Sequence, residues 1–163
     1  MNTIRVAILF GTLGIFLFFI NSGIITSERN IENATVAYLD LAPRDPRSLI
    51  QGDFMQLAYA IERDANSDAT EDRGQLVVSL DDSGIVSYER VYDATTSLAD
   101  NEMLINYFEG RRAIRVGVDS FFFQEGQADD YARARYAEVR ILENGGVMLI
   151  NLTDENLVVI NPD

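Results

Sequence analysis

The sequence contains no lysine, histidine, cysteine or tryptophan among its 163 residues. Without these side chains it cannot build a structural disulfide, a Cys/His zinc site, a Ser-His-Asp triad or a lysine Schiff base. Its 13 basic residues are all arginine, and with 26 acidic residues they leave a net charge of −13. Nucleic-acid binding needs a basic surface, so this charge argues against a nucleic-acid partner. The length suits one domain with its own core.

The N-terminus carries a long apolar run. Residues 6–20 contain no charge, and apolar residues resume at 23–25. Counted from Ile4 to Ile25, the run is long enough to cross a bilayer, which needs ~20 residues. A cleaved signal peptide is the alternative, but no A-x-A-like site follows Ile20. The sequence therefore predicts an uncleaved transmembrane anchor at residues 1–27 and a second region at residues 28–163.

Charge around this run predicts its orientation. Arg5 is the one basic residue before the run, and all 26 acidic residues follow it. The positive-inside rule counts arginine and lysine, so it favours a cytoplasmic N-terminus. We expect a single-pass signal-anchor protein whose acidic domain lies on the extracytoplasmic side.

Beyond the run, apolar residues recur at every second position, as in strands. The alternating segments are residues 35–41, 53–62, 75–80, 85–92, 103–108, 113–123, 136–142 and 147–152, with a last short one at 157–160. Turn-forming residues separate several of them, most clearly at 81–84 and 143–146. Acids precede arginines at 127–135, which favours one short helix. This pattern predicts a mainly β domain, an antiparallel sandwich or partly open barrel with one short helix.

Two of the predicted strands specify which side chains share a face. In the first, at residues 53–62, the shared face holds Met55, Leu57, Tyr59 and Ile61, while Phe54 points to the other side. In the second, at residues 113–123, it holds Ile114, Val116, Val118, Ser120 and Phe122.

Residues 52–59 read GDFMQLAY. This stretch resembles the family named for its GDYxxLxY motif, with Gly52, Asp53, Leu57 and Tyr59 matching and Phe54 in place of the motif's Tyr. Similarity extends to residues 41–49, 115–126 and 136–139. The resemblance implies a membrane-anchored bacterial protein of no established activity, in the cytoplasmic membrane. Members tend to be encoded beside multi-span membrane proteins, which implies an integral-membrane partner.

The motif also has a physical interpretation. Gly52 and Asp53 suit a turn that leads into a strand, because Gly tolerates a positive φ and Asp bonds nearby backbone amides. Leu57 and Tyr59 are two residues apart, so they can pack on one side of a strand. We interpret the motif as structural, a core strand with a fixed turn.

Residues 48–53 are also similar to the Thr-Leu-x-x-Gly-Asp stretch that follows the nucleophile in type I signal peptidases. Those enzymes pair a serine with a lysine base. This chain has no lysine, and an arginine stays protonated and cannot replace it. The resemblance therefore does not extend to shared chemistry.

Oxygen-bearing side chains alternate along residues 64–72, as in the first part of a calcium loop. The candidate ligands are Asp64, Asn66, Asp68 and Thr70. However, Ala69 occupies the position of the loop's Gly, and Gln75 that of the bidentate Glu which closes such a site. A solvated loop and a calcium-tuned binding domain are the two alternatives.

These observations favour a non-catalytic accessory or interaction module of the bacterial cell envelope. Its contacts would come from exposed sheet edges or from Phe121, Phe122 and Phe123, although this triplet could equally belong to the core. The alternative is an envelope hydrolase that uses carboxylates; the sequence identifies no catalytic residue for it.

Overall fold

The computed structural model describes residues 10–18, 33–42, 54–110 and 113–162. The chain forms two units, Met1–Ala34 and Thr35–Asp163. In the first unit, residues 10–18 are helical with exposed side chains. No helix within the described ranges is both long and apolar enough to span a membrane. Most of the predicted anchor at residues 1–27 lies outside these ranges, so the anchor stays a prediction.

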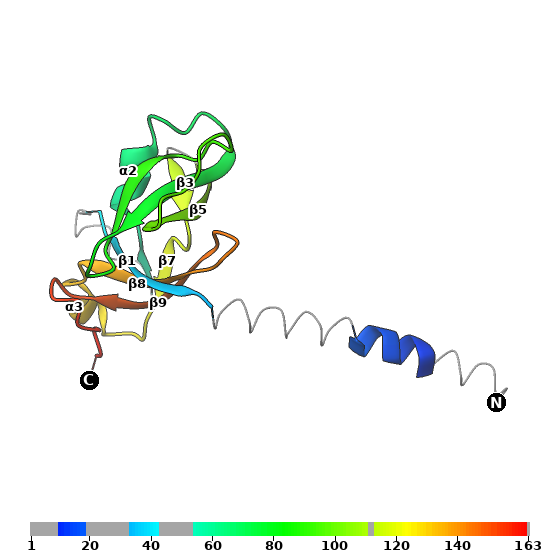
Figure 1. Ribbon diagram of the computed structural model, residues 1–163. Helices are drawn as coiled ribbons and strands as arrows, with labels where there is room; N and C mark the ends of the chain where they lie inside the picture. The colour runs from blue at the N-terminus through cyan, green and yellow to red at the C-terminus, as the bar shows by residue number, and fades with distance from the viewer. Residues whose placement is uncertain (1–9, 19–32, 43–53, 111–112, 163) are drawn as a thin grey trace. The chain divides into compact units, whose positions relative to one another are not determined.

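In the described residues, the second unit consists mainly of antiparallel strands in three sheets (Figure 1). The arrangement includes a half-barrel. The first sheet has the order β1 (Thr35–Asp40), β8 (Tyr136–Ile141), β9 (Val147–Thr153). The second pairs β2 (Phe54–Gln56) with β7 (Ser120–Phe122). The third has the order β4 (Val86–Val91), β3 (Arg73–Leu80), β5 (Glu102–Glu109), β6 (Ile114–Val116). The predicted mainly β, antiparallel fold is confirmed.

The core is built by strand alternation. Ala37 and Leu39 on β1 face inward, as do Ala137, Val139 and Ile141 on β8, and all five side chains are buried. The strands pair directly, with Thr35 opposite Ile141 and Asp40 opposite Tyr136. The amide of Tyr38 donates to the carbonyl of Gly84 at 2.9 Å, so β1 also contacts the β3–β4 hairpin. One core therefore extends across the first and third sheets.

The hairpin predicted at residues 81–84 is present. One carboxylate oxygen of Asp81 accepts hydrogen bonds from the amides of Ser83 (2.8 Å) and Ile85 (2.9 Å). Gly84 takes the left-handed conformation that closes the turn, with φ +79°. The acidic residue at this turn thus has a structural role.

The same turn recurs near the C-terminus with a different closing residue. Asp154 accepts hydrogen bonds from the amides of Asn156 (2.8 Å) and Val158 (3.0 Å). Here Leu157 occupies the left-handed position, with φ 61°. The segment beyond it makes one isolated bridge, Val159 to Thr153, in place of the short strand predicted at 157–160.

The prediction of a continuous strand over residues 53–62 is wrong. β2 ends at Gln56, and helix α2 (Ala60–Ala65) begins four residues later. The carboxylate of Glu62 accepts the amide hydrogen of Tyr59 at 3.4 Å, which caps the first turn of the helix. Ile61 and Ala65, four positions apart, supply the buried face of α2. A second short helix thus joins the predicted one, α3, which covers Ala128–Tyr131.

The strand predicted over residues 113–123 is divided into β6 and β7. Gly117 separates them with φ +63°, and a Cβ built there would lie 3.1 Å from the side chain of Val147. Ile114 and Val116 before the glycine are buried. Val118 and Phe122 after it are exposed, so the shared face ends at Gly117. The bend moves the chain from the third sheet to the second.

Candidate functional site

The motif residues differ sharply in exposure. Leu57 and Tyr59 are 2% and 1% exposed, whereas the side chain of Phe54 is 43% exposed on β2. Gly52 and Asp53 lie outside the described residues. The motif therefore contributes both to the core and to the surface.

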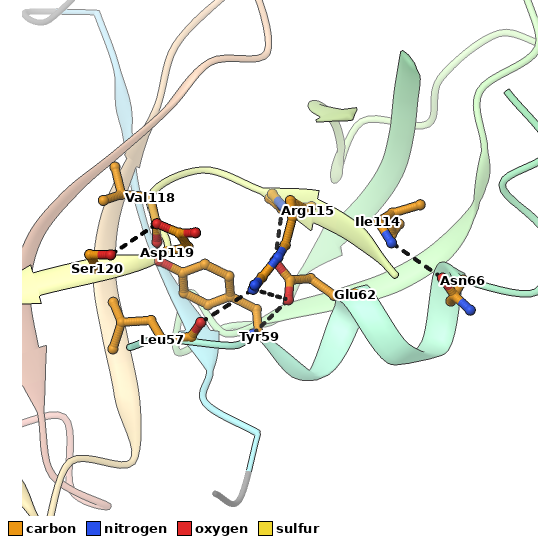
Figure 2. A network of polar contacts seen from close by, with 10 residues as sticks. Leu57, Tyr59, Glu62, Asn66, Ile114, Arg115, Val118, Asp119 and Ser120 are labelled. Carbon is orange, nitrogen blue, oxygen red and sulfur yellow. Dashed lines mark hydrogen bonds and ion pairs between the residues drawn. The ribbon is translucent and has the colours of Figure 1, made fainter. Parts of the chain in front are cut away.

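Tyr59 connects the start of α2 to the segment between β6 and β7 (Figure 2). Its hydroxyl donates a hydrogen bond to the carbonyl of Val118 at 2.7 Å. Burial raises the pKa of Tyr59, and the carboxylates of Glu62 and Asp119 raise it further. The phenol therefore stays protonated around neutral pH and serves as a hydrogen-bond donor.

Glu62 is a buried acidic side chain, only 6% exposed. One carboxylate oxygen accepts the amide hydrogen of Val116 at 3.0 Å, and the other accepts that of Tyr59 at 3.4 Å. Arg115 adds an ion pair at 3.7 Å and reaches the carbonyl of Leu57 at 3.5 Å (Figure 2). The carboxylate is thus bonded to two backbone amides and has an arginine beside it.

Two further hydrogen bonds join the same segments. The side-chain oxygen of Asn66 accepts the amide hydrogen of Ile114 at 3.2 Å, and the amide of Leu57 donates to the carbonyl of Asp119 at 2.8 Å. We call this network the motif latch: Leu57, Tyr59, Glu62 and Asn66 bonded to residues 114–119. Its polar groups bond to backbone or to each other, an arrangement that fixes the fold.

The candidate calcium ligands are engaged in other contacts. Asp64 pairs with the exposed Arg63 at 3.3 Å, and Asn66 belongs to the motif latch. Asp68 accepts a hydrogen bond from the hydroxyl of Tyr88 at 2.7 Å, which lowers the pKa of the Asp68 carboxyl. Asn66 and Thr70 line an open depression of about 230 Å³ together with other polar and acidic residues. Within the described ranges no three His, Cys, Asp or Glu side chains are grouped as metal ligands, and the calcium set stays a prediction.

The phenylalanine triplet is divided between core and surface. Phe121 and Phe123 pack against Tyr131 of α3, with ring centroids 5.0 and 5.3 Å away. Phe122 points outward and is 75% exposed. It lies directly opposite Phe54 on β2, and the two ring centroids are 5.8 Å apart. We call Phe54 and Phe122 the aromatic pair.

Sequence reasoning missed Glu62, Arg115 and the role of Asn66. Their contacts join α2 to β6, which are about 50 residues apart in the sequence, so the spacing of neighbouring residues does not predict them. One local signal was available: Glu62 lies three residues after Tyr59. An acid at this spacing is typical of a capped helix start.

Comparison with known proteins identifies one family for this chain. The sequence model of the family described as GDYXXLXY protein matches residues 16–152. The matched range contains the whole motif latch and the aromatic pair. No curated protein and no solved structure matches the chain significantly.

Proposed function

Since the chain belongs to the GDYXXLXY protein family, we propose that it is a membrane-anchored accessory module of the bacterial cell envelope. In this proposal the folded domain acts by binding, not by catalysis, and its partner is an integral-membrane protein. The domain lies on the extracytoplasmic side of the cytoplasmic membrane.

One observation carries the proposal: the motif divides into a buried part and an exposed part. Leu57 and Tyr59 are buried in the core and belong to the motif latch, and the Tyr59 hydroxyl donates its hydrogen bond to the carbonyl of Val118. Phe54 takes the place of the motif's first Tyr, and its side chain remains exposed beside Phe122. Exposed aromatic side chains are enriched at protein–protein contacts, so this division supports binding.

The membrane assignment rests on the sequence. The apolar run from residue 4 to residue 25 has the length of a membrane span, and Arg5 favours a cytoplasmic N-terminus. The acidic residues all follow the run, so the domain is repelled by anionic lipid headgroups. Such a domain is better suited to contact a protein beside its anchor than the bilayer itself.

Affinity purification of the full chain in mild detergent tests the proposal. We expect a tag at the C-terminus to recover an integral-membrane protein in stable stoichiometry. As a control, replacing residues 6–20 with an equal number of leucines should keep the partner, because the folded domain supplies the contacts. Recovery of no membrane protein with the unaltered chain would refute the proposal.

Orientation needs a separate measurement. Protease added to spheroplasts should degrade the domain, because the proposal places it outside the cytoplasm. A domain that is degraded only after the membrane is permeabilised would contradict the extracytoplasmic placement.

A further inference from the structure

The two-stranded ribbon of β2 and β7 presents the aromatic pair on one face and packs its other face inward. Phe54 is opposite Phe122 in the register, and Met55 is opposite Phe121. Met55 and Phe121 pack against the core, whereas the aromatic pair is exposed. Successive strand residues face opposite sides, so this ribbon has one buried and one exposed apolar face.

The aromatic pair differs from the other exposed apolar residues. Single exposed apolar side chains are normal on protein surfaces, and Phe108 on β5 and Val158 near the C-terminus are examples. Phe54 and Phe122 instead contact each other, with rings 5.8 Å apart and tilted by 40°. The ribbon has two strands, and no third strand pairs with it in the described part of the chain.

Charge indicates what covers this face. Asp119 and Glu125 flank β7 and are exposed, and residues 54–57 and 118–127 contain no arginine. Arg115 reaches the Leu57 carbonyl, but its charge is paired with the carboxylate of Glu62. A second copy of this chain carries the same charge of −13, so electrostatic repulsion opposes self-association. An anionic bilayer is opposed for the same reason. An apolar segment with basic residues beside it matches this face in both hydrophobicity and charge.

We propose that the aromatic pair is the docking site for an extramembrane segment of the integral-membrane partner, an apolar segment flanked by lysine or arginine. This inference rests on the proposed function and adds the surface and the chemistry of the contact. The aromatic rings pack on the apolar residues, while Asp119 and Glu125 attract the basic ones.

Site-specific photo-crosslinking of the full chain in intact cells tests the location. A photoreactive phenylalanine analogue at position 122 should crosslink to an integral-membrane protein, at a segment that contains apolar residues next to lysine or arginine. The same analogue at position 108 is the matched control, since Phe108 is also exposed but lies on β5, and it should give no such crosslink. Crosslinks from position 122 to lipid or to a second copy, or equal crosslinking from both positions, would overturn the inference.

Substitutions provide the second readout. Phe122→Ser should reduce the recovered partner by roughly tenfold or more, as expected for an aromatic residue central to a contact. Phe108→Ser should leave recovery unchanged, and Phe54→Tyr should retain it because the aromatic face remains. Both serine variants remove exposed side chains, so their melting temperatures should match that of the unaltered chain, which separates loss of binding from loss of folding.

The two proposals fail in different ways. If the unaltered chain recovers no membrane protein, the proposed function is wrong and this inference with it. If it recovers one and Phe122→Ser recovers as much, the accessory role stands and the docking site is overturned. Weaker recovery at high salt with the unaltered chain would support the charge complementarity, because salt screens exposed charges.

Discussion

The substitution Glu62→Gln tests whether backbone amides or the arginine hold the buried carboxylate of the motif latch. Gln has nearly the same shape, but it carries no charge and its amide nitrogen is a donor. Its one oxygen can still accept the amide hydrogen of Val116, now 3.0 Å from the carboxylate. The side-chain nitrogen of the glutamine then faces the backbone N–H of Tyr59, and because both groups are donors, no hydrogen bond forms between them.

The expected loss follows from these contacts. Hydrogen bonds to a charged acceptor contribute about 1.5–3 kcal/mol each. Glu62→Gln loses the bond to the Tyr59 amide, and the bond to the Val116 amide then has an uncharged acceptor. Together these losses should lower the free energy of unfolding by about 2–3 kcal/mol. Arg115→Gln removes the ion pair of 3.7 Å to Glu62 and the hydrogen bond of 3.5 Å to the Leu57 carbonyl, but it leaves both amide bonds to the carboxylate in place, so its cost should be smaller, about 1 kcal/mol.

Thermal and urea unfolding of the full chain in detergent, followed by far-UV circular dichroism, measures both losses. For a domain of this size, Glu62→Gln should lower the midpoint by roughly 8–12 °C. Glu125→Gln is the matched control, because Glu125 is exposed, and it should change stability by less than about 0.5 kcal/mol. If Arg115→Gln is the more destabilising variant, or if Glu62→Gln unfolds like the control, the carboxylate is not held by the backbone as we argue.

Three other predictions concern single contacts. Tyr59→Phe removes the hydroxyl bond to Val118 and should cost about 1 kcal/mol in urea unfolding; an unchanged midpoint would show that this bond adds nothing. Gly84→Ala should destabilise by about 1 kcal/mol, because its φ of +79° is unfavourable for alanine although a Cβ has ordinary clearance there; equal or higher stability would contradict this. The hydrogen bonds from Arg90, with a further one from the Ala99 amide, lower the pKa of Glu102 from 4.5 to about 2, so their stabilising effect is complete above pH 4.5 and is lost as the pH falls towards 2. The difference in melting temperature between the unaltered chain and Arg90→Gln should therefore shrink over that interval, and a constant difference would refute the assignment.

Alternation and turn chemistry were sufficient to predict most strands. The turn at Asp81 has a local cause, two amide bonds to one carboxylate oxygen, and this can be recognised from neighbouring residues. β8 and β9 likewise follow from alternation on either side of a glycine turn.

The errors arose where distant contacts decide the structure. Leu57, Tyr59 and Ile61 are all buried, as their spacing predicts, but an extended link followed by a helix buries them as well as a strand would. The cap at Tyr59 is completed by Glu62, whose other oxygen is held by Val116 far along the chain. Tertiary contacts of this kind override the local pattern.

The candidate site was predictable in part. The sequence pattern placed Phe54 on the strand face opposite Met55 and left the triplet of residues 121–123 as either surface contacts or core, but it could not pair Phe54 with Phe122. That pairing depends on the register of β2 and β7, and β7 begins only after the bend at Gly117. A glycine inside an apolar strand pattern does signal such a bend, although not its direction.

The pairing of β1 with β8 has a consequence for how the chain is made. Thr35 pairs with Ile141, so the first strand of the domain waits for one of the last before it can join a sheet, although Tyr38 already has a bond to Gly84 of the β3–β4 hairpin. The motif latch can form earlier in synthesis, because Val118, the partner of Tyr59, is made before Ile141. Ribosomes add about 5–20 residues per second, so the nascent domain spends several seconds with an unpaired strand edge. A chain that stops before residue 136 lacks β8 and β9 and leaves β1 without its sheet, so quality-control proteases should remove such products.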